Sequence, residues 1–268
     1  MTRTTLRLSA VDAQYDAPIV GRVVLVLGDE SVEIELVVPE GKVAFEDTLP
    51  VLQKLTDFIV DREAAVAETS GRTVSCRAGC GACCRQLVPI SQAEARALVR
   101  LVAAMPDPRR ARIRRRFEAA LKALDASGLL ADIDAARESE SGVVGDLGMR
   151  YFRQRIACPF LEDDSCSIHP DRPLTCRQYL VTSPASNCQN PSPATIEMVR
   201  LPVKPSQALL VADTIDSNVA WMPLIYALTY DEQVPPQAPM RTAPDILRDV
   251  FLRLADAGGQ PGGVAVKE

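Results

Sequence analysis

Residues 1–45 alternate apolar and polar side chains, which is the two-residue period of a β-strand with one buried face. The alternation is weak around Leu6 and Leu8 and clear in 22–27 and 32–38. The segment 28–31, Gly-Asp-Glu-Ser, joins the last two as a hairpin loop. The pattern therefore predicts a small antiparallel sheet with one face in water.

From residue 48 onward the apolar positions recur at the spacing of amphipathic helices. Ser91 and Glu94 form a capping box at one helix start, and Asp107 before Pro108 marks another. Segment 142–148 and the Pro-, Asp- and Ser-rich segment 158–188 are expected to be loops. The predicted helices are 48–69, 91–105, 107–127, 131–139, 206–213, 219–230 and 244–257.

These patterns predict a mainly α (α+β) fold. Helices surround a loop-rich cysteine centre, and the small antiparallel β element lies at the N-terminus. We expect a β-hairpin element at 1–45, a helical cysteine-cluster domain at 46–258 and a disordered tail at 259–268. An apolar content of 47% is enough for a hydrophobic core.

The eight cysteines fall into two groups, with long cysteine-free stretches on either side. Thiolates gathered in this way suit zinc and iron–sulfur clusters. We therefore expect a metal centre whose ligands are Cys76, Cys80, Cys83 and Cys84 with Cys158, Cys166, Cys176 and Cys188.

The spacing of the first group bears on how many metal ions are held. Cys80 and Cys83 form a C-x2-C turn in which Gly81 supplies backbone freedom. Cys84 follows directly, and neighbouring side chains usually diverge, which favours two centres or one polynuclear cluster. Eight thiolates suit two four-cysteine sites, and Pro159 after Cys158 is also found in ferredoxin-type motifs. Arginines beside the cysteines could offset their negative charge, namely Arg85, Arg172 and Arg177.

Two other interpretations of the cysteines stay open, disulfides and buried inert thiols. Segment 1–14 has no apolar stretch typical of a secretory signal, and no apolar run approaches the length of a membrane span. We therefore expect a cytoplasmic protein with reduced thiols. A net charge of −5 and 4% aromatic residues argue against nucleic acid and membranes as partners. A metal ion or cluster is the expected partner, and a protein partner is a second candidate.

Several single features have a plain structural explanation. His169, the one histidine, is expected to be a loop residue near the site rather than a ligand, and for Cys188 the two outcomes balance. Asp163–Asp164 reads as a turn rather than a catalytic pair. The arginine run 109–116 reads as a solvated helix face rather than a binding site for phosphate or an acidic partner.

Three motifs stand in a fixed order: CGACC at 80–84, CPFL at 158–161 and CSIHPDRPLTCRQY at 166–179. In these the chain resembles the YkgJ-type cysteine-cluster family, which is described as zinc- or iron-chelating and has the pattern CxxCxxCC. Two departures are the longer C-x3-C gap after Cys76 and His169 in place of the usual tyrosine. The resemblance implies metal binding by Cys76, Cys80, Cys83, Cys84, Cys158, Cys166 and Cys176.

The functional hypothesis is a metal-binding protein that holds an iron–sulfur cluster and/or zinc in an accessory or structural role. The alternative is an iron–sulfur-dependent redox or protein-modifying enzyme, because the flagellin lysine methylases carry a similar cluster. No catalytic residue is assigned, and whether the chain is an enzyme stays open. A thiol–disulfide redox sensor is the third hypothesis.

Overall fold

The computed structural model describes residues 3–10, 18–28, 30–77, 79–138, 145–192, 194–214, 221–229, 240–257 and 265–267. Helices contain more of these residues than strands do, so the fold is mainly α with some β. The helices are α1 (Leu49–Thr69), α2 (Gln92–Ala103), α3 (Asp107–Ala126), α4 (Leu130–Glu138), α5 (Gly145–Arg153), α6 (Leu174–Gln178), α7 (Pro205–Ala212) and α8 (Ala243–Ala257).

The main sheet has the order β1-β3-β2-β10. Its strands are β1 (Arg3–Ser9), β2 (Pro18–Leu27), β3 (Glu30–Pro39) and β10 (Ala265–Lys267). The predicted hairpin is β2 with β3, but β1 pairs with β3 in parallel, so the sheet is mixed rather than purely antiparallel. Within the tail expected to be disordered, residues 265–267 instead pair with β2, while 258–264 and 268 lie outside the described residues.

Three two-stranded ladders and several short 3₁₀ turns connect these elements. The ladders pair β4 (Lys42–Val43) with β9 (Arg241–Thr242), β5 (Pro89–Ile90) with β8 (Met222–Pro223) and β6 (Leu161–Glu162) with β7 (Ser165–Cys166). The 3₁₀ turns are η1 (Phe45–Thr48), η2 (His169–Asp171), η3 (Ala185–Gln189) and η4 (Leu224–Tyr226).

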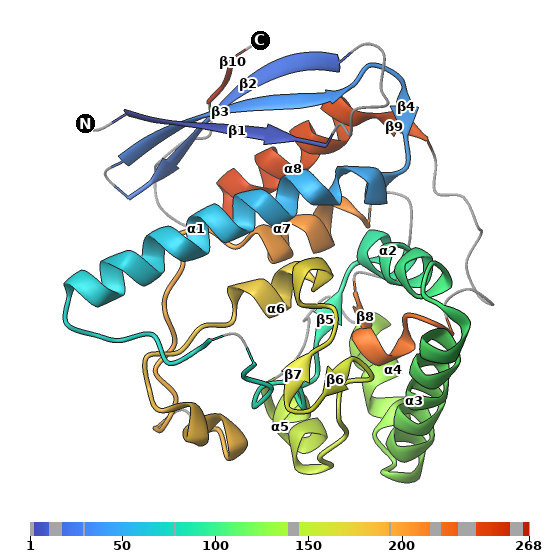
Figure 1. The fold of residues 1–268 in the computed structure, drawn as a ribbon. Coiled ribbons are helices and arrows are strands. Elements are labelled where there is room, and N and C mark those ends of the chain that lie inside the picture. Colours follow the sequence, from blue (N-terminus) through green and yellow to red (C-terminus); the bar gives the residue numbers. More distant parts are fainter. Residues whose placement is uncertain are drawn as a thin grey trace.

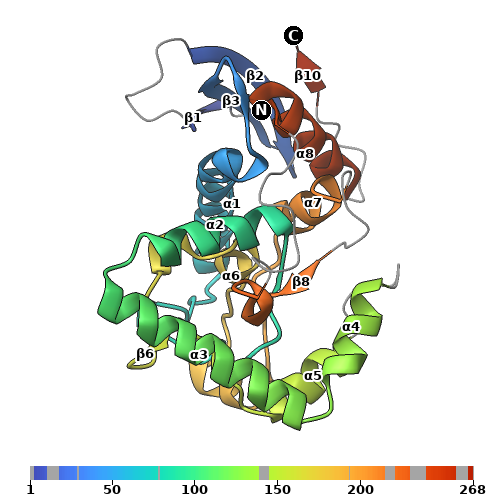
Figure 2. The same cartoon turned by 90° about the vertical axis from the view of Figure 1, so that its right-hand side faces the viewer.

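The elements form layers (Figures 1 and 2). The sheet lies at one end, α1 and α8 cover one of its faces, α7 packs behind these two helices, and both chain ends lie at the sheet. Beyond this helical layer come α2, α3 and α6, with the ladder of β6 and β7 among them. The cysteine-bearing loops therefore lie at the end opposite the sheet.

The capping box predicted from the sequence is present at the start of α2. Ser91 Oγ accepts from the Glu94 N–H at 3.1 Å and Glu94 Oε2 accepts from the Ser91 N–H at 2.9 Å, as a capping box requires. Helix α1 has Thr48 at its N-cap, and Asp47 accepts from the Ala44 N–H in the preceding 3₁₀ turn η1. Helix α3 includes Asp107 and has Pro106 at its N-cap.

Two predictions about 142–148 and 219–230 were wrong. Residues from Gly145 onward belong to α5, not to a loop. Of the helix expected at 219–230, the described part is instead β8 followed by η4. Pro223 has no N–H for a helical bond, and Met222 pairs with Ile90, so a ladder replaces the helix.

Three hydrophobic clusters hold the layers together. The first joins the sheet to α1, α7 and α8, so the predicted N-terminal element shares one core with the helices. The second lies between α2, α3 and the cysteine loops and contains the edge-to-face pair Phe117–Phe160, with centroids 5.4 Å apart. The third packs α4 and α5 on the end of α3. No helix among the described residues is long and apolar enough to span a membrane.

Candidate metal centre

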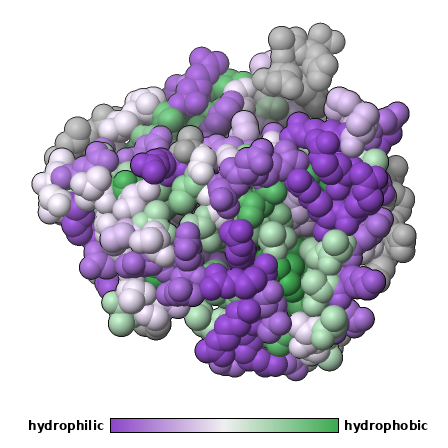
Figure 3. Space-filling model, turned by 60° about the horizontal axis from the view of Figure 1, so that its bottom comes forward, coloured by the Kyte–Doolittle hydropathy of each residue, from purple (hydrophilic) through white to green (hydrophobic). Residues whose placement is uncertain are grey.

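All eight cysteines line a single cavity of about 290 Å³. Cys188 is buried and the other seven are half-buried, and all eight are free thiols. The end of the molecule that carries these loops shows a strip of apolar surface between hydrophilic side chains (Figure 3). The structure thus gathers every candidate from 76–84 and from 158–188, and their binding of metal stays a prediction.

A backbone hydrogen bond joins the two cysteine segments directly. The Cys158 N–H donates to the Cys84 carbonyl at 2.8 Å, and the Ser75 N–H donates to the Val181 carbonyl at 2.9 Å. Turns within each segment are closed by Cys84 N–H to Gly81 O at 3.0 Å and by Leu161 N–H to Cys158 O at 2.9 Å. These hydrogen bonds hold the two ligand-bearing segments together through the protein backbone.

Gly81 lies where the two segments touch. A Cβ at this position would lie 2.5 Å from Leu161 Cδ1 and 2.8 Å from the carbonyl carbon of Asp164. Its φ is not positive, so close approach requires the glycine, rather than the backbone freedom expected from the sequence. Asp163 and Asp164 form the opposing turn, with φ of 48° and 55°, which supports the prediction of a turn.

Gly81→Ala should separate the two segments, because the contact is with backbone atoms that cannot rotate away. We expect a loss of about 1–3 kcal/mol in the free energy of unfolding and weaker metal retention. Denaturant unfolding and metal content per chain measure both effects. Gly41→Ala is the control, since no atom lies within 4 Å of its added methyl. Equal stability of the two variants would contradict this role of Gly81.

Backbone N–H groups point at several of the sulfurs. The Val181 N–H donates to Cys76 Sγ at 3.4 Å, and the N–H groups of Phe160 and Ile168 donate to the sulfurs of Cys158 and Cys166. Such bonds stabilise thiolates and tune a bound metal. Cys83 and Cys84 both line the cavity, and whether they share one metal ion stays a prediction.

The cavity favours neutral thiols while it holds no metal. Burial raises the pKa of Cys158 to about 12 and that of Cys188 to about 11. The hydrogen bond with Cys84 and then burial raise the pKa of Cys83, and burial raises the pKa of Cys176. No three His, Cys, Asp or Glu side chains of the described residues are already placed as a set of metal ligands. Metal uptake would therefore turn thiols inward and release their protons.

The three arginines proposed to offset thiolate charge have different surroundings. Arg177 is buried and donates to both carboxylate oxygens of Asp57, at 2.7 and 2.8 Å. Its Nε donates to the Arg172 carbonyl at 2.9 Å and its other amino group to the Pro170 carbonyl. Arg85 pairs with Asp164 at 3.8 Å. Arg177 thus fastens the loop before Cys176 to α1 and does not face the sulfurs.

Replacing Arg177 should destabilise the protein, because charge-assisted bonds to one carboxylate and two carbonyls are lost together. We expect Arg177→Met to lower the free energy of unfolding by about 2–3 kcal/mol. Arg177→Lys should recover little of it, since one ammonium cannot reach all three partners. The measurement is denaturant unfolding at fixed metal load. Arg248→Met, which removes an exposed pair with Asp245, is the control, and similar losses in both would refute the assignment.

Other arginines donate to backbone carbonyls beside the cysteines. Arg109 donates to the Ser167 carbonyl at 2.8 Å, next to Cys166. Arg116 reaches the Pro159 carbonyl at 3.4 Å, next to Cys158, and Glu162 at 2.9 Å. Arg155, which follows α5, donates to the Gln189 carbonyl at 2.7 Å, next to Cys188. Two arginines of the run 109–116 therefore hold the cysteine loops in place, which the prediction of a solvated helix face did not include. The signal was that backbone carbonyls of a loop have no strand partner and need other donors.

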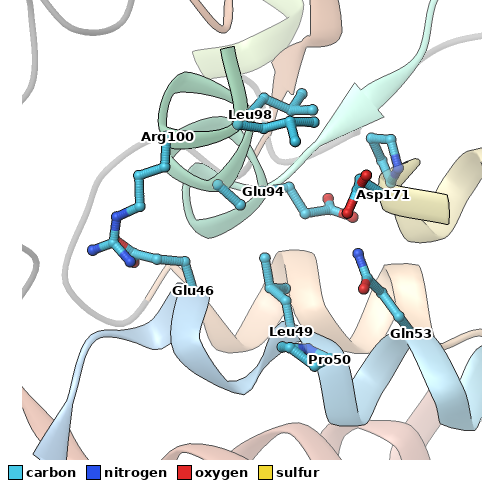
Figure 4. A pocket seen from close by; sticks show the side chains of 11 residues that line it. Glu46, Leu49, Pro50, Gln53, Glu94, Leu98, Arg100 and Asp171 are labelled. Atoms are coloured by element: carbon cyan, nitrogen blue, oxygen red, sulfur yellow. The ribbon is translucent and has the colours of Figure 1, made fainter. Parts of the chain in front are cut away.

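Glu94 connects α2 to the helix that carries Cys176. Its carboxylate accepts from the N–H of Ser91 at 2.9 Å and from the N–H of Leu174, the first residue of α6, at 2.8 Å. It lines a second cavity of about 270 Å³ between α1 and α2, where it lies opposite Asp171, while Arg100 pairs with Glu46 (Figure 4). Burial raises the pKa of Glu94 to about 7, and burial raises that of nearby Asp213 to about 6.

A pH dependence of stability follows from Glu94. Its pKa rises from an ordinary 4.5 to about 7 on folding, so the native state keeps a proton that the unfolded chain releases. This contribution to the free energy of unfolding is complete below pH 4.5 and is lost as the pH rises towards 7. Glu94→Gln cannot ionise, so the stability of the wild type relative to this variant should fall by about 3 kcal/mol across that window.

Urea unfolding at steps between pH 4.5 and 8 measures this difference. Taking it between two proteins cancels the contributions that they share, including that of Asp213 to the extent that it titrates independently. Glu118→Gln, at an exposed position of α3, should keep a constant difference from the wild type. A pH-independent difference for Glu94→Gln would show that its carboxylate is ionised throughout.

Comparison with known families adds one result. Residues 75–194 match the family model described as "CxxCxxCC: Putative zinc- or iron-chelating domain". This segment is similar to that domain. It holds all eight cysteines and occupies somewhat less than half of the chain. No curated protein and no solved structure matches the chain.

The matched segment 75–194 also contains His169 and Cys188, for which the sequence did not decide between metal ligand and neighbouring residue. His169 lines the cysteine cavity, and partial burial and then the charges of Arg172 and Arg177 lower its pKa. Cys188 lines the same cavity as the other sulfurs. Both are therefore near enough to take part, and whether they bind metal stays a prediction.

Proposed function

We propose that the protein binds zinc or an iron–sulfur cluster through its clustered cysteines, in an accessory or structural role. The observation that carries this proposal is the convergence of eight free thiols on one cavity from two remote segments. The described residues that line the cavity supply eight thiols and the His169 imidazole but no carboxylate, which suits thiophilic metals and not Mg²⁺ or Ca²⁺. The similarity to the CxxCxxCC domain, with its zinc- or iron-chelating description, supports the same conclusion.

The structural role follows from where the ligands lie. Cys76 to Cys84 follow α1, whereas Cys158 to Cys188 belong to a region with short turns and one short helix. A metal held by both groups cross-links two loops that otherwise meet through a few backbone hydrogen bonds. Structural zinc supplies on the order of 10 kcal/mol in small domains, so such a link would dominate the stability of this region.

The deciding experiment is anaerobic purification followed by elemental analysis and a visible spectrum. Bound iron with broad visible absorbance supports a cluster, and colourless protein with bound zinc supports the zinc alternative. Cys83→Ser and Cys158→Ser, one from each segment, should each lower the metal bound per chain. Ala82→Ser places the same hydroxyl in the same turn without removing a sulfur and should retain the metal. Wild-type protein with eight reactive thiols and no metal would overturn the proposal.

An iron–sulfur-dependent enzyme is the second candidate, favoured by the other groups that line the cavity. Thr175, Tyr179 and His169 face the same space as the sulfurs, as does apolar Phe160. A cluster with an open coordination position would allow a substrate to reach iron, whereas four thiolates on each metal close the site. Counting the thiols that stay reactive in metal-loaded protein separates the two, because a closed pair of four-cysteine sites leaves none.

A further inference from the structure

Arg172 differs from the other arginines near the cysteines. Its side chain lines the cysteine cavity, and its Nε is buried with no hydrogen-bond partner. Within the described parts of the chain it also forms no ion pair with a carboxylate. A buried N–H without an acceptor is costly, so such a group usually marks the site of a bound partner.

The backbone beneath this side chain is fixed. The Arg172 carbonyl accepts from Arg177 Nε, and Arg177 is itself held by Asp57 of α1. Pro173 follows and restricts the backbone of Arg172 to extended conformations, at the start of α6. The guanidinium therefore enters the cavity from a rigid base, which is the condition for donating to one defined acceptor.

Arg172 also reaches sulfurs of both segments electrostatically. Its positive charge favours the thiolate form of Cys76 and Cys83 in the first segment and of Cys166 in the second. Arg77, the other arginine that lines the cavity, is exposed. The sulfurs and the guanidinium thus form one cluster of opposite charges once the thiols ionise.

We infer that Arg172 is a positioning residue of the metal centre: its Nε–H donates to a metal-bound thiolate, and its charge offsets the negative charge of the thiolate cage. The inference rests on the proposed function. A divalent ion with four thiolates carries excess negative charge, which repels the ligands from one another unless a cation lies close by. Residues that hold ligands in this way typically change metal affinity 10- to 100-fold when replaced.

The test compares wild type, Arg172→Met, Arg172→Lys and Arg77→Met, each loaded anaerobically with its metal. The rate of metal transfer to a chromogenic chelator is the main readout, and far-UV circular dichroism reports folding. Arg172→Met should release metal at least tenfold faster with an unchanged circular dichroism spectrum. Arg172→Lys keeps the charge but loses the planar donor, so its rate of metal release should lie between those of the wild type and Arg172→Met. Arg77→Met should match the wild type. If the metal is iron, Arg172→Met should also have a more negative reduction potential.

The outcomes separate this inference from the proposed function. Wild-type protein that binds no metal overturns both. Wild-type protein that binds metal, together with Arg172→Met that releases it at the wild-type rate, overturns the role of Arg172 alone, as does an equal acceleration in Arg77→Met. If Arg172→Met does not fold, Arg172→Lys decides, since a wild-type release rate there overturns the hydrogen bond to sulfur.

Discussion

The hydrogen bond from the Cys158 N–H to the Cys84 carbonyl is the contact on which the candidate site depends. It fixes the backbones of two cysteines that are remote in the sequence, and Gly81 lets the turn of Asp163 and Asp164 pack directly against the first segment. The entropy of closing such a long loop is then offset by protein contacts rather than by the metal alone.

In the loops that carry the cysteines, many backbone carbonyls have no partner in a neighbouring strand. Arginine side chains donate hydrogen bonds to several of these carbonyls. Arg109, Arg116 and Arg155 each bond to the carbonyl of the residue that follows a cysteine, and Arg177 bonds to two carbonyls before Cys176. Arg109 and Arg116 come from α3, Arg177 comes from α6, and Arg155 comes from the turn after α5. The cysteines of the second segment are thus positioned from outside by guanidinium groups, while Arg172 enters the cavity itself.

The parts of the structure that follow from short-range rules could be predicted from the sequence. The capping box of Ser91 and Glu94, the β2–β3 hairpin and the grouping of the cysteines are of this kind. The rest depended on partners distant in the chain. Residues 222–223 carry a helical pattern but pair with Pro89–Ile90, and Gly81 is required by an approach of Asp164 that no local motif reveals. The arginines of α3 look like a solvated face until the loop that they contact is known.

Helix α6 connects the cavity to the rest of the fold. Leu174 is buried in the core that joins the sheet to α1, α7 and α8, whereas Cys176, two residues later, lines the cavity. The apolar residues around the sulfurs, such as Phe160 and Leu224, belong instead to the second core. This short helix, which Glu94 and Arg177 hold at its two ends, therefore connects the cavity to the core beneath the sheet. A metal bound by Cys176 would be coupled to that core through Leu174, two residues away on the same helix.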